Sequence, residues 1–254
     1  MFTHNIDPVL VSIGPFEIRY YGLFFVLGFV IAYFMLNYLV KRKKIGLTKD
    51  DIADFLLYIM IGTVLGARIF YVFAYNLPFY LQNPFEAVAI WHGGLSFHGG
   101  FIGAIIATFY FCKKKKIDFY TIADIAVIPL ALGLALGRLG NFTNGELYGR
   151  ITNVPWAVKF PDAEGFRHPS QIYEALKDLI IFFTLWIIKD KKFPPGFMFW
   201  LFVVMYSALR FFVEFFRQPD EQLGFIIGFL SMGQILSVVM FFVGIVFIYK
   251  LLYK

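Results

Sequence analysis

The sequence predicts an all-α fold, a polytopic transmembrane helical bundle of about seven spans with a small cap on its outer face. The first observation is composition: the 254 residues are 59% hydrophobic and only 16% charged, whereas soluble domains carry about 25% charged residues. The second is a series of apolar stretches, each close to the roughly 20 residues that a helical span needs. The third is an uneven distribution of Lys and Arg between the loops, which is typical of membrane proteins.

The predicted spans follow one another along the chain. They cover residues 19–40, 52–75, 95–112, 122–139, 171–188, 196–216 and 231–250. Residues 1–18 lack the basic and apolar regions of a cleavable signal peptide. The longest outer loop, residues 140–170, contains several prolines and aromatic residues and is interpreted as an ordered cap. Residues 1–254 are therefore interpreted as one integral membrane domain that includes this cap.

The basic residues predict the orientation of the chain. The loops 41–51, 113–121 and 189–195, together with the C-terminus, contain 14 Lys and Arg residues. The segments on the other side contain only 4, and these segments are 1–18, 76–94, 140–170 and 217–230. Because Lys and Arg favour the cytoplasmic side, the N-terminus is expected outside and the C-terminus in the cytoplasm. These loops explain the net charge of +6 better than a nucleic-acid partner does.

Polar side chains gather in the outer half of the predicted spans. A basic residue at the centre of a span costs on the order of 3 kcal/mol on insertion scales, so such residues are usually paired or functional. The orientation places these residues at or toward the outer ends of their spans: Tyr21, Arg68, His98, Arg138, Gln171, Glu174, Arg210 and Glu214. Their distribution indicates chemistry at the outer leaflet.

Some of these charges also fit a structural role. Arg210 and Glu214 are four residues apart, so they are expected to pair on one helix face, and such a pair can also hold a catalytic arginine in place. Arg68 fits a packing or snorkelling role as well as a functional one. Lys177 and Asp178 are adjacent and are expected to be satisfied by each other or by neighbouring helices.

Two glycine-rich segments, residues 92–103 and 137–150, indicate a site. In the first, His98 lies among glycines that allow close helix approach, and a histidine can act as acid or base near neutral pH. In the second, an apolar helix ends in glycines, amides and charges. Broken helix ends expose backbone N–H groups that suit anions, and Arg138 adds a bidentate grip on phosphate.

Several chemistries are not predicted. The single cysteine, Cys112, allows no intrachain disulfide and no zinc spacing. The four histidines form no complete metal-ligand pattern, and no nucleotide-binding motif lies in a strand–helix context. The expectation is therefore that no metal or other cofactor is needed.

Taken together, the motifs resemble the prolipoprotein diacylglyceryl transferase family over nearly the whole chain. Several long motifs in one order are far more specific than any one of them. One small departure is Phe101, where the family usually carries leucine. The motifs are Tyr21-Gly22, Ser96-Phe-His98-Gly-Gly-Phe-Ile-Gly103, Gly137 to Arg150, Arg167-His-Pro-Ser-Gln171 with Tyr173-Glu174, Phe211-Phe-Val-Glu214-Phe-Phe-Arg217-Gln-Pro-Asp220, and Ser231-Met-Gly-Gln234.

The resemblance implies an activity and its partners. The diacylglyceryl group of phosphatidylglycerol would move to the lipobox cysteine thiol of a prolipoprotein, forming a thioether and releasing glycerol 1-phosphate. This is the first step of bacterial lipoprotein maturation, on the outer face of the cytoplasmic (inner) membrane. The outer position of the polar residues, inferred from loop charges, agrees with this location.

The resemblance also directs the assignment of site residues. Arg138 and Arg210 are assigned to the lipid headgroup and the leaving phosphate. His98 is the candidate base for the thiol, with Tyr21 as an alternative donor or orienting group. An arginine-lined site could also lower the thiol pKa without a protein base. The remaining substrate-binding candidates are Asn141 as a hydrogen-bonding group, Glu146 and Glu214 as groups that orient the arginines, and Gly149 as a point of close backbone approach.

Two other classes of protein remain as alternatives. A transporter or scramblase for an anionic lipid also uses buried arginines and broken helices, but it should place polar residues along a whole path. The inner halves of the spans are nearly free of strong charges apart from Asp54, Asp124 and the deeper Asp178. A non-enzymatic membrane scaffold does not explain the outer polar cluster.

Overall fold

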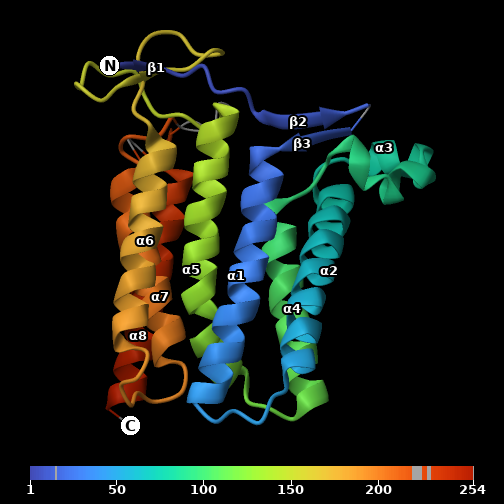
Figure 1. Ribbon diagram of the computed structural model, residues 1–254, viewed down its shortest axis with the longest axis vertical. Coiled ribbons are helices and arrows are strands. Elements are labelled where there is room, and N and C mark those ends of the chain that lie inside the picture. The colour runs from blue at the N-terminus through green and yellow to red at the C-terminus, as the bar shows by residue number, and fades with distance from the viewer. Residues whose placement is uncertain (15, 219–224, 228–229, 254) are drawn as a thin grey trace. The chain divides into compact units, whose positions relative to one another are not determined.

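The computed structural model describes residues 1–14, 16–218, 225–227 and 230–253. The chain forms two compact units (Figure 1). The first unit comprises Met1–Met35 and Ala123–Lys254, and the second comprises Leu36–Ile122. Pro219 and Asp220, which end one of the quoted motifs, lie outside the described residues.

Each predicted span corresponds to a helix, which confirms the all-α class. The helices are α1 (Tyr20–Arg42), α2 (Lys49–Ala74), α4 (Phe97–Lys115), α5 (Phe119–Asn144), α6 (Ser170–Ile188), α7 (Phe197–Val213) and α8 (Met232–Leu252). Within the described residues, α1, α2, α5 and α8 are long and apolar enough to cross a membrane, and α7 is apolar but shorter. The helices are therefore compatible with a membrane bundle, and the count of seven spans stays a prediction.

The helix ends follow from local sequence. Thr48 caps α2 and Ser231 caps α8. In both cases a side-chain oxygen of the third helical residue, Asp51 or Gln234, accepts a hydrogen bond from the backbone N–H of the cap, which is a capping box. Helix α5 continues to Asn144, five residues past the predicted end of its span, and stops at Gly145 with a φ of +71°. The longer helix places the motif residues 137–144 on a helix instead of in a loop.

In the first unit, α7 packs against both α6 and α8. The rings of Trp200 and Phe247 stack with centroids 4.1 Å apart across α7 and α8. Asp124 of α5 fixes the start of α7, because its carboxylate accepts hydrogen bonds from the backbone N–H groups of Gly196 at 2.7 Å and Phe199 at 2.9 Å. A charge that the sequence alone left unexplained thus satisfies a helix N-terminus, which is a structural role.

Short strands complete the first unit. Strand β1 (Phe2–Thr3) pairs in parallel with β4 (Val158–Lys159) of the predicted cap. Strands β2 (Val9–Ile13) and β3 (Phe16–Arg19) form an antiparallel hairpin that leads into α1. Strands β5 (Phe225–Ile227) and β6 (Leu230–Ser231) precede α8. Composition alone did not predict these pairings.

In the second unit, α2 and α4 lie against each other through glycines. A Cβ added at Gly103 would collide with the Gly62 carbonyl oxygen, and one added at Gly99 would collide with the Gly66 carbonyl oxygen. Glycine at these positions therefore allows the helix backbones to approach closely. Between these helices the chain forms α3 (Leu77–Gln82) and the 3-10 helices η1 (Pro84–Val88) and η2 (Ile90–His92).

Candidate functional site

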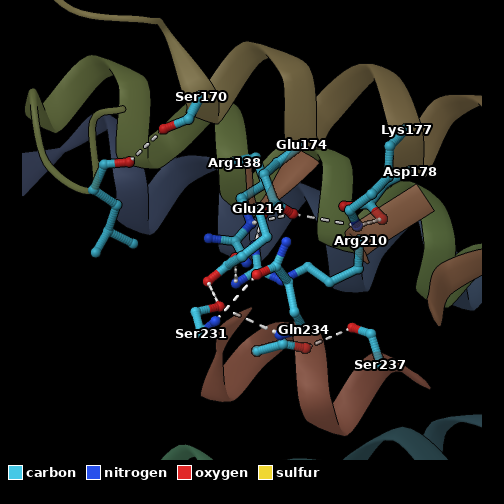
Figure 2. Close-up of polar contacts among 12 residues, drawn as sticks. Arg138, Ser170, Glu174, Lys177, Asp178, Arg210, Glu214, Ser231, Gln234 and Ser237 are labelled. Carbon is cyan, nitrogen blue, oxygen red and sulfur yellow. Dashed lines mark hydrogen bonds and ion pairs between the residues drawn. The ribbon is translucent and has the colours of Figure 1, made fainter. Parts of the chain in front are cut away.

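A cluster of polar and charged side chains is buried in the first unit (Figure 2). We call it the Glu174 cluster. Its members come from the four helices α5 to α8, from the turn after α7 and from the end of strand β6. They are Arg138, Glu174, Lys177, Asp178, Arg210, Glu214, Ser231 and Gln234.

Glu174 is the centre of the cluster. Its side chain is only 2% exposed, and it pairs with cations from three positions. Its Oε2 lies 3.7 Å from Arg138 Nε and 3.3 Å from Lys177 Nζ. Its Oε1 contacts Nη1 of Arg210. One carboxylate therefore holds together two arginines that are 72 residues apart in sequence and lie on different helices.

The charges of the cluster balance. Arg210 Nη2 lies 2.7 Å from Glu214 Oε2, and Lys177 also pairs with Asp178. The predicted pairing of residues 210 and 214 is thus confirmed. The three cations face three carboxylates, so the group is formally neutral. Neutrality matters because an unpaired charge is strongly disfavoured in a low-dielectric interior.

The first turn of α8 closes one side of the cluster. Ser231 Oγ donates a hydrogen bond to Glu214 Oε1 at 2.9 Å and also caps the helix by accepting from the Gln234 backbone N–H. A Cβ added at Gly233 would lie 2.9 Å from Glu214 Oε1. The motif Ser231 to Gln234 therefore packs directly on the carboxylate that holds Arg210.

The end of α5 carries the predicted amide group. Asn141 Nδ2 donates to Glu146 Oε1 at 2.8 Å, and Asn144 Nδ2 donates to the same oxygen at 3.3 Å. Glu146 was expected to orient an arginine, but in the structure its side chain accepts hydrogen bonds from these two amides. Glu146 contacts these neighbours because it lies only five residues after Asn141 in the chain.

The anion-binding role expected for this helix end needs a correction. The broken segment is the C-terminal end of α5, where carbonyl groups rather than N–H groups are left over. The buried His4 side chain meets one of them, with Nε2 2.7 Å from the Phe142 carbonyl oxygen. Any grip on an anion here comes from arginine side chains and not from the helix terminus.

The motif at residues 167–171 supports the loop that follows α5. Ser170 Oγ donates to the Leu147 carbonyl at 2.9 Å, and Gln171 Nε2 donates to the Glu146 carbonyl at 2.6 Å. Leu147 has a φ of +57°, an unfavourable region for a branched residue. The start of α6 thus fixes a strained loop next to Asn141.

A second hydrogen-bond chain holds the predicted cap. Trp156 Nε1 donates to the Tyr173 hydroxyl at 2.7 Å, and that hydroxyl lies 3.0 Å from His168 Nδ1. Burial lowers the pKa of the His168 imidazole, which favours the neutral ring that can accept from the tyrosine. These residues stabilise the loop between α5 and α6.

Gly149 allows a close approach between protein segments. Its N–H donates to the His168 carbonyl at 2.9 Å, and it forms a bridge to Arg217. A Cβ at this position would collide with the Phe216 carbonyl oxygen. The expected backbone approach is therefore present, and the partner in the structure is the protein itself.

Tyr21 lies beside the same end of α5. It is 40% exposed, and a Cβ added at Gly140 would lie 2.8 Å from Tyr21 Cδ2. Gly140 stands between Arg138 and Asn141 in the chain. The structure thus brings Tyr21 next to the helix turn that carries both of these candidates.

His98 belongs to the second unit, where it is the second residue of α4 and is exposed. Arg68 belongs to the same unit and is 5% exposed. The guanidinium of Arg68 donates to the carbonyls of Ala87 at 3.0 Å and Gly94 at 3.0 Å, and to three further carbonyls between residues 86 and 93. Of the two alternatives for Arg68, these contacts support the structural one, an anchor for the loop between α2 and α4.

Five buried members of the cluster were not predicted as site residues from sequence, namely Glu174, Lys177, Asp178, Ser231 and Gln234. Glu174 and Gln234 are 2% and 1% exposed, respectively. Both lie in the motifs given above. For Glu174 the sequence did contain a signal, because the basic residues in the predicted spans need acidic partners. The pairing itself depends on helix packing and is not visible in the sequence.

Comparison with known proteins gives a consistent result. The family model for prolipoprotein diacylglyceryl transferase matches residues 8–250. A relative from Geobacter sulfurreducens is 48% identical over 96% of this chain and 94% of its own length. Relatives from Desulfotalea psychrophila and Vibrio atlanticus are 43% and 44% identical, covering 94% and 95% of this chain and 91% and 89% of their own lengths. All three are named phosphatidylglycerol--prolipoprotein diacylglyceryl transferase.

Proposed function

Since the chain belongs to the prolipoprotein diacylglyceryl transferase family, we propose that the Glu174 cluster binds the headgroup of its lipid substrate. The protein is a transferase that moves the diacylglyceryl group from phosphatidylglycerol to a prolipoprotein, the first step of lipoprotein maturation. The observation that carries the proposal is the pairing of Arg138 and Arg210 with one buried carboxylate.

The arginines can hold a phosphate without leaving Glu174. A guanidinium has five N–H donors in a fixed fork, so an arginine can keep a carboxylate partner and still offer N–H groups to a second anion. Arg138 is 23% exposed and Arg210 is 12% exposed, whereas Lys177 is 3% exposed. A ligand would therefore reach the guanidinium groups first, while Lys177 stays behind Glu174 as its fixed counter-charge.

The reaction requires stabilisation of a leaving phosphate. The substrate thiol would form a C–S bond to the glyceryl carbon while the C–O bond to phosphate breaks. The bonding electrons leave with glycerol 1-phosphate, and the thiol gives up its proton. A positioned donor in a dry, preorganised site is worth roughly 3 kcal/mol in the barrier. We assign this role to Arg138 and Arg210, with Glu214 orienting Arg210.

The remaining roles are proposals of the same kind. Tyr21 would donate to or orient the substrate beside Gly140. Asn141, fixed by Glu146, would hydrogen-bond the headgroup, and Gly149 would keep the adjoining loop close. His98 is proposed as the base that accepts the thiol proton, since free cysteine has a pKa of about 8.5. The arginines alone could instead lower that pKa.

Substrates and location complete the proposal. The apolar helices and the family support a multi-pass membrane protein. We propose that it lies in the bacterial cytoplasmic membrane with the N-terminus outside, the C-terminus in the cytoplasm and the active site toward the outer face. The acceptor would be the lipobox cysteine of a signal peptide. Residues 140–170 would form the outer cap of one membrane domain.

The direct test uses purified protein, labelled phosphatidylglycerol and a lipobox peptide, with thioether formation as the measurement. Arg138→Ala should abolish transfer while the protein still inserts, because it removes a phosphate donor. Arg19→Ala is the matched control, since Arg19 pairs with Glu17 in an exposed hairpin and should leave transfer nearly unchanged. Near-normal transfer by Arg138→Ala would contradict the headgroup assignment.

A further inference from the structure

Gln234 is a buried amide that uses only part of its hydrogen-bonding capacity. The residue is 1% exposed. Its Oε1 accepts a hydrogen bond from the Ser231 backbone N–H at 3.0 Å. Its Nε2 has no acceptor among the described residues. A buried donor without a partner is costly, so such a group needs an explanation.

The orientation of this amide is fixed by the helix cap. Gln234 is the third helical residue in the capping box that starts α8. The Ser231 N–H requires an acceptor, so the oxygen must face the cap and the NH₂ group must point away from it. Figure 2 shows the side chain reaching toward Arg210 and Glu214.

The helix cap alone does not account for the amide. A glutamate at this position makes the same capping box, and the equivalent residue of the cap on α2 is the acidic Asp51. The part of Gln234 that a glutamate would lack is the NH₂ donor. That donor is the group without a partner in the structure.

The surroundings identify the chemistry of the missing acceptor. Ser231 bonds Glu214 Oε1, and Glu214 Oε2 lies 2.7 Å from Arg210 Nη2. Because the Gln234 side chain reaches toward Arg210 in Figure 2, the orphan donor lies on the side of the cluster that holds the cation assigned to the lipid phosphate. An amide adds a hydrogen bond to an anionic ligand without changing the neutral charge balance of the cluster.

We propose that Gln234 is a substrate-binding residue whose Nε2 donates a hydrogen bond to an oxygen of the phosphatidylglycerol headgroup. The inference rests on the proposed function of the Glu174 cluster and extends it to the first turn of α8. The same side chain thereby stabilises the helix cap through its oxygen and donates a hydrogen bond to the ligand through its nitrogen.

Two substitutions separate these roles. Gln234→Glu keeps the capping oxygen and removes the donor. Gln234→Met removes both but adds no charge and nearly conserves volume. Ser237→Ala is the matched control one turn along α8, because Ser237 is 5% exposed and its hydroxyl bonds the Gly233 carbonyl at 2.7 Å. The apparent KM for phosphatidylglycerol is measured in mixed micelles at saturating lipobox peptide and expressed as a mole fraction of the lipid. The kcat and the thermal unfolding temperature are measured for the same variants.

Both Gln234 variants should raise this KM by roughly ten- to hundredfold, as expected for one hydrogen bond to a charged group, with a smaller change in kcat. Ser237→Ala should stay within about twofold of the wild type. A wild-type KM in Gln234→Met overturns the inference, and an increase confined to Gln234→Glu overturns it too, because charge would then be the cause. Absence of transfer by the wild type would instead contradict the proposed function itself.

Discussion

The carboxylate of Glu174 compensates the positive charge of the two buried arginines and allows them to lie close together. Burying one charge costs several kcal/mol even after relaxation, and attraction to a partner recovers this only with good geometry. Arg138, Lys177 and Arg210 all contact this one carboxylate. Asp178 and Glu214 supply the other two negative charges. The charges of the network are thus balanced before the proposed anionic headgroup binds.

Removing the charge of Glu174 should therefore unbalance the whole cluster. Glu174→Gln leaves three cations against two carboxylates, and breaking a buried pair typically costs about 3–5 kcal/mol. We expect the free energy of unfolding to fall by about that amount in detergent, together with lower transfer activity. Glu164→Gln is the control, because Glu164 is exposed in the loop between α5 and α6. Equal stability of the two variants would contradict the central role of Glu174.

His98 presents a different case at the same scale, since its proposed role is proton transfer. A general base contributes about 10²–10⁴-fold to the rate. His98→Asn keeps a polar side chain but cannot titrate. We expect kcat to fall by at least about 10²-fold and the rate to lose the pH dependence that a base imposes. A variant that keeps much of its rate across the pH range would favour activation of the thiol by the arginines alone.

At the scale of helices, hydropathy predicted the elements well and their ends less well. All seven apolar stretches form helices, because a span must satisfy its backbone internally. The prediction ended the fourth stretch at 139, whereas α5 continues to Asn144. A prediction from hydropathy ends where the apolar stretch ends, even when the helix continues beyond it. The polar last turn, which carries Asn141, is stabilised by His4 and Glu146 instead.

The candidate site was predictable where its contacts are local. Arg210 and Glu214 pair at the spacing that one helix face provides. The link from Glu174 to Arg138 and Arg210 joins three helices and depends on their packing. The same limit applies to Arg68, whose carbonyl partners lie 18 to 26 residues further along the chain. Sequence pattern alone left both of its roles open.

The glycines of α2 and α4 give an element-scale prediction. Gly103→Ala places a methyl group against the Gly62 carbonyl, so the helices must separate, and overpacking of this kind costs about 1–3 kcal/mol. Gly133→Ala on α5 is the matched control, because a Cβ there meets nothing within 4 Å and alanine stabilises a helix by roughly 0.5–1 kcal/mol over glycine. Thermal unfolding in detergent should move in opposite directions for the two variants. A shift in the same direction would contradict the close packing of α2 and α4.

For the whole molecule, loop charge and the position of the cysteine support the same proposed arrangement. The predicted inner loops and the C-terminus together carry 14 of the Lys and Arg residues, and the predicted outer segments carry 4. Cys112, the single cysteine, is 4% exposed and lies next to Lys113 at the end of α4 that leads into a predicted inner loop. In this proposed arrangement the reacting thiol is that of the prolipoprotein, and the enzyme is expected to supply no nucleophile of its own.

This arrangement can be tested in intact cells. In a Cys112→Ser background, Glu164→Cys places a thiol in the predicted outer cap and Lys191→Cys places one in a predicted inner loop, and both positions are exposed. A membrane-impermeant maleimide should label the Glu164 position in intact cells and the Lys191 position only after permeabilisation, because Lys and Arg hold their loops in the cytoplasm. Reversed labelling would place the active site on the opposite face.

The same Cys112→Ser background tests the origin of the nucleophile. This variant should retain transfer. Loss of activity in a correctly folded variant would mean that the enzyme's own cysteine takes part in the reaction.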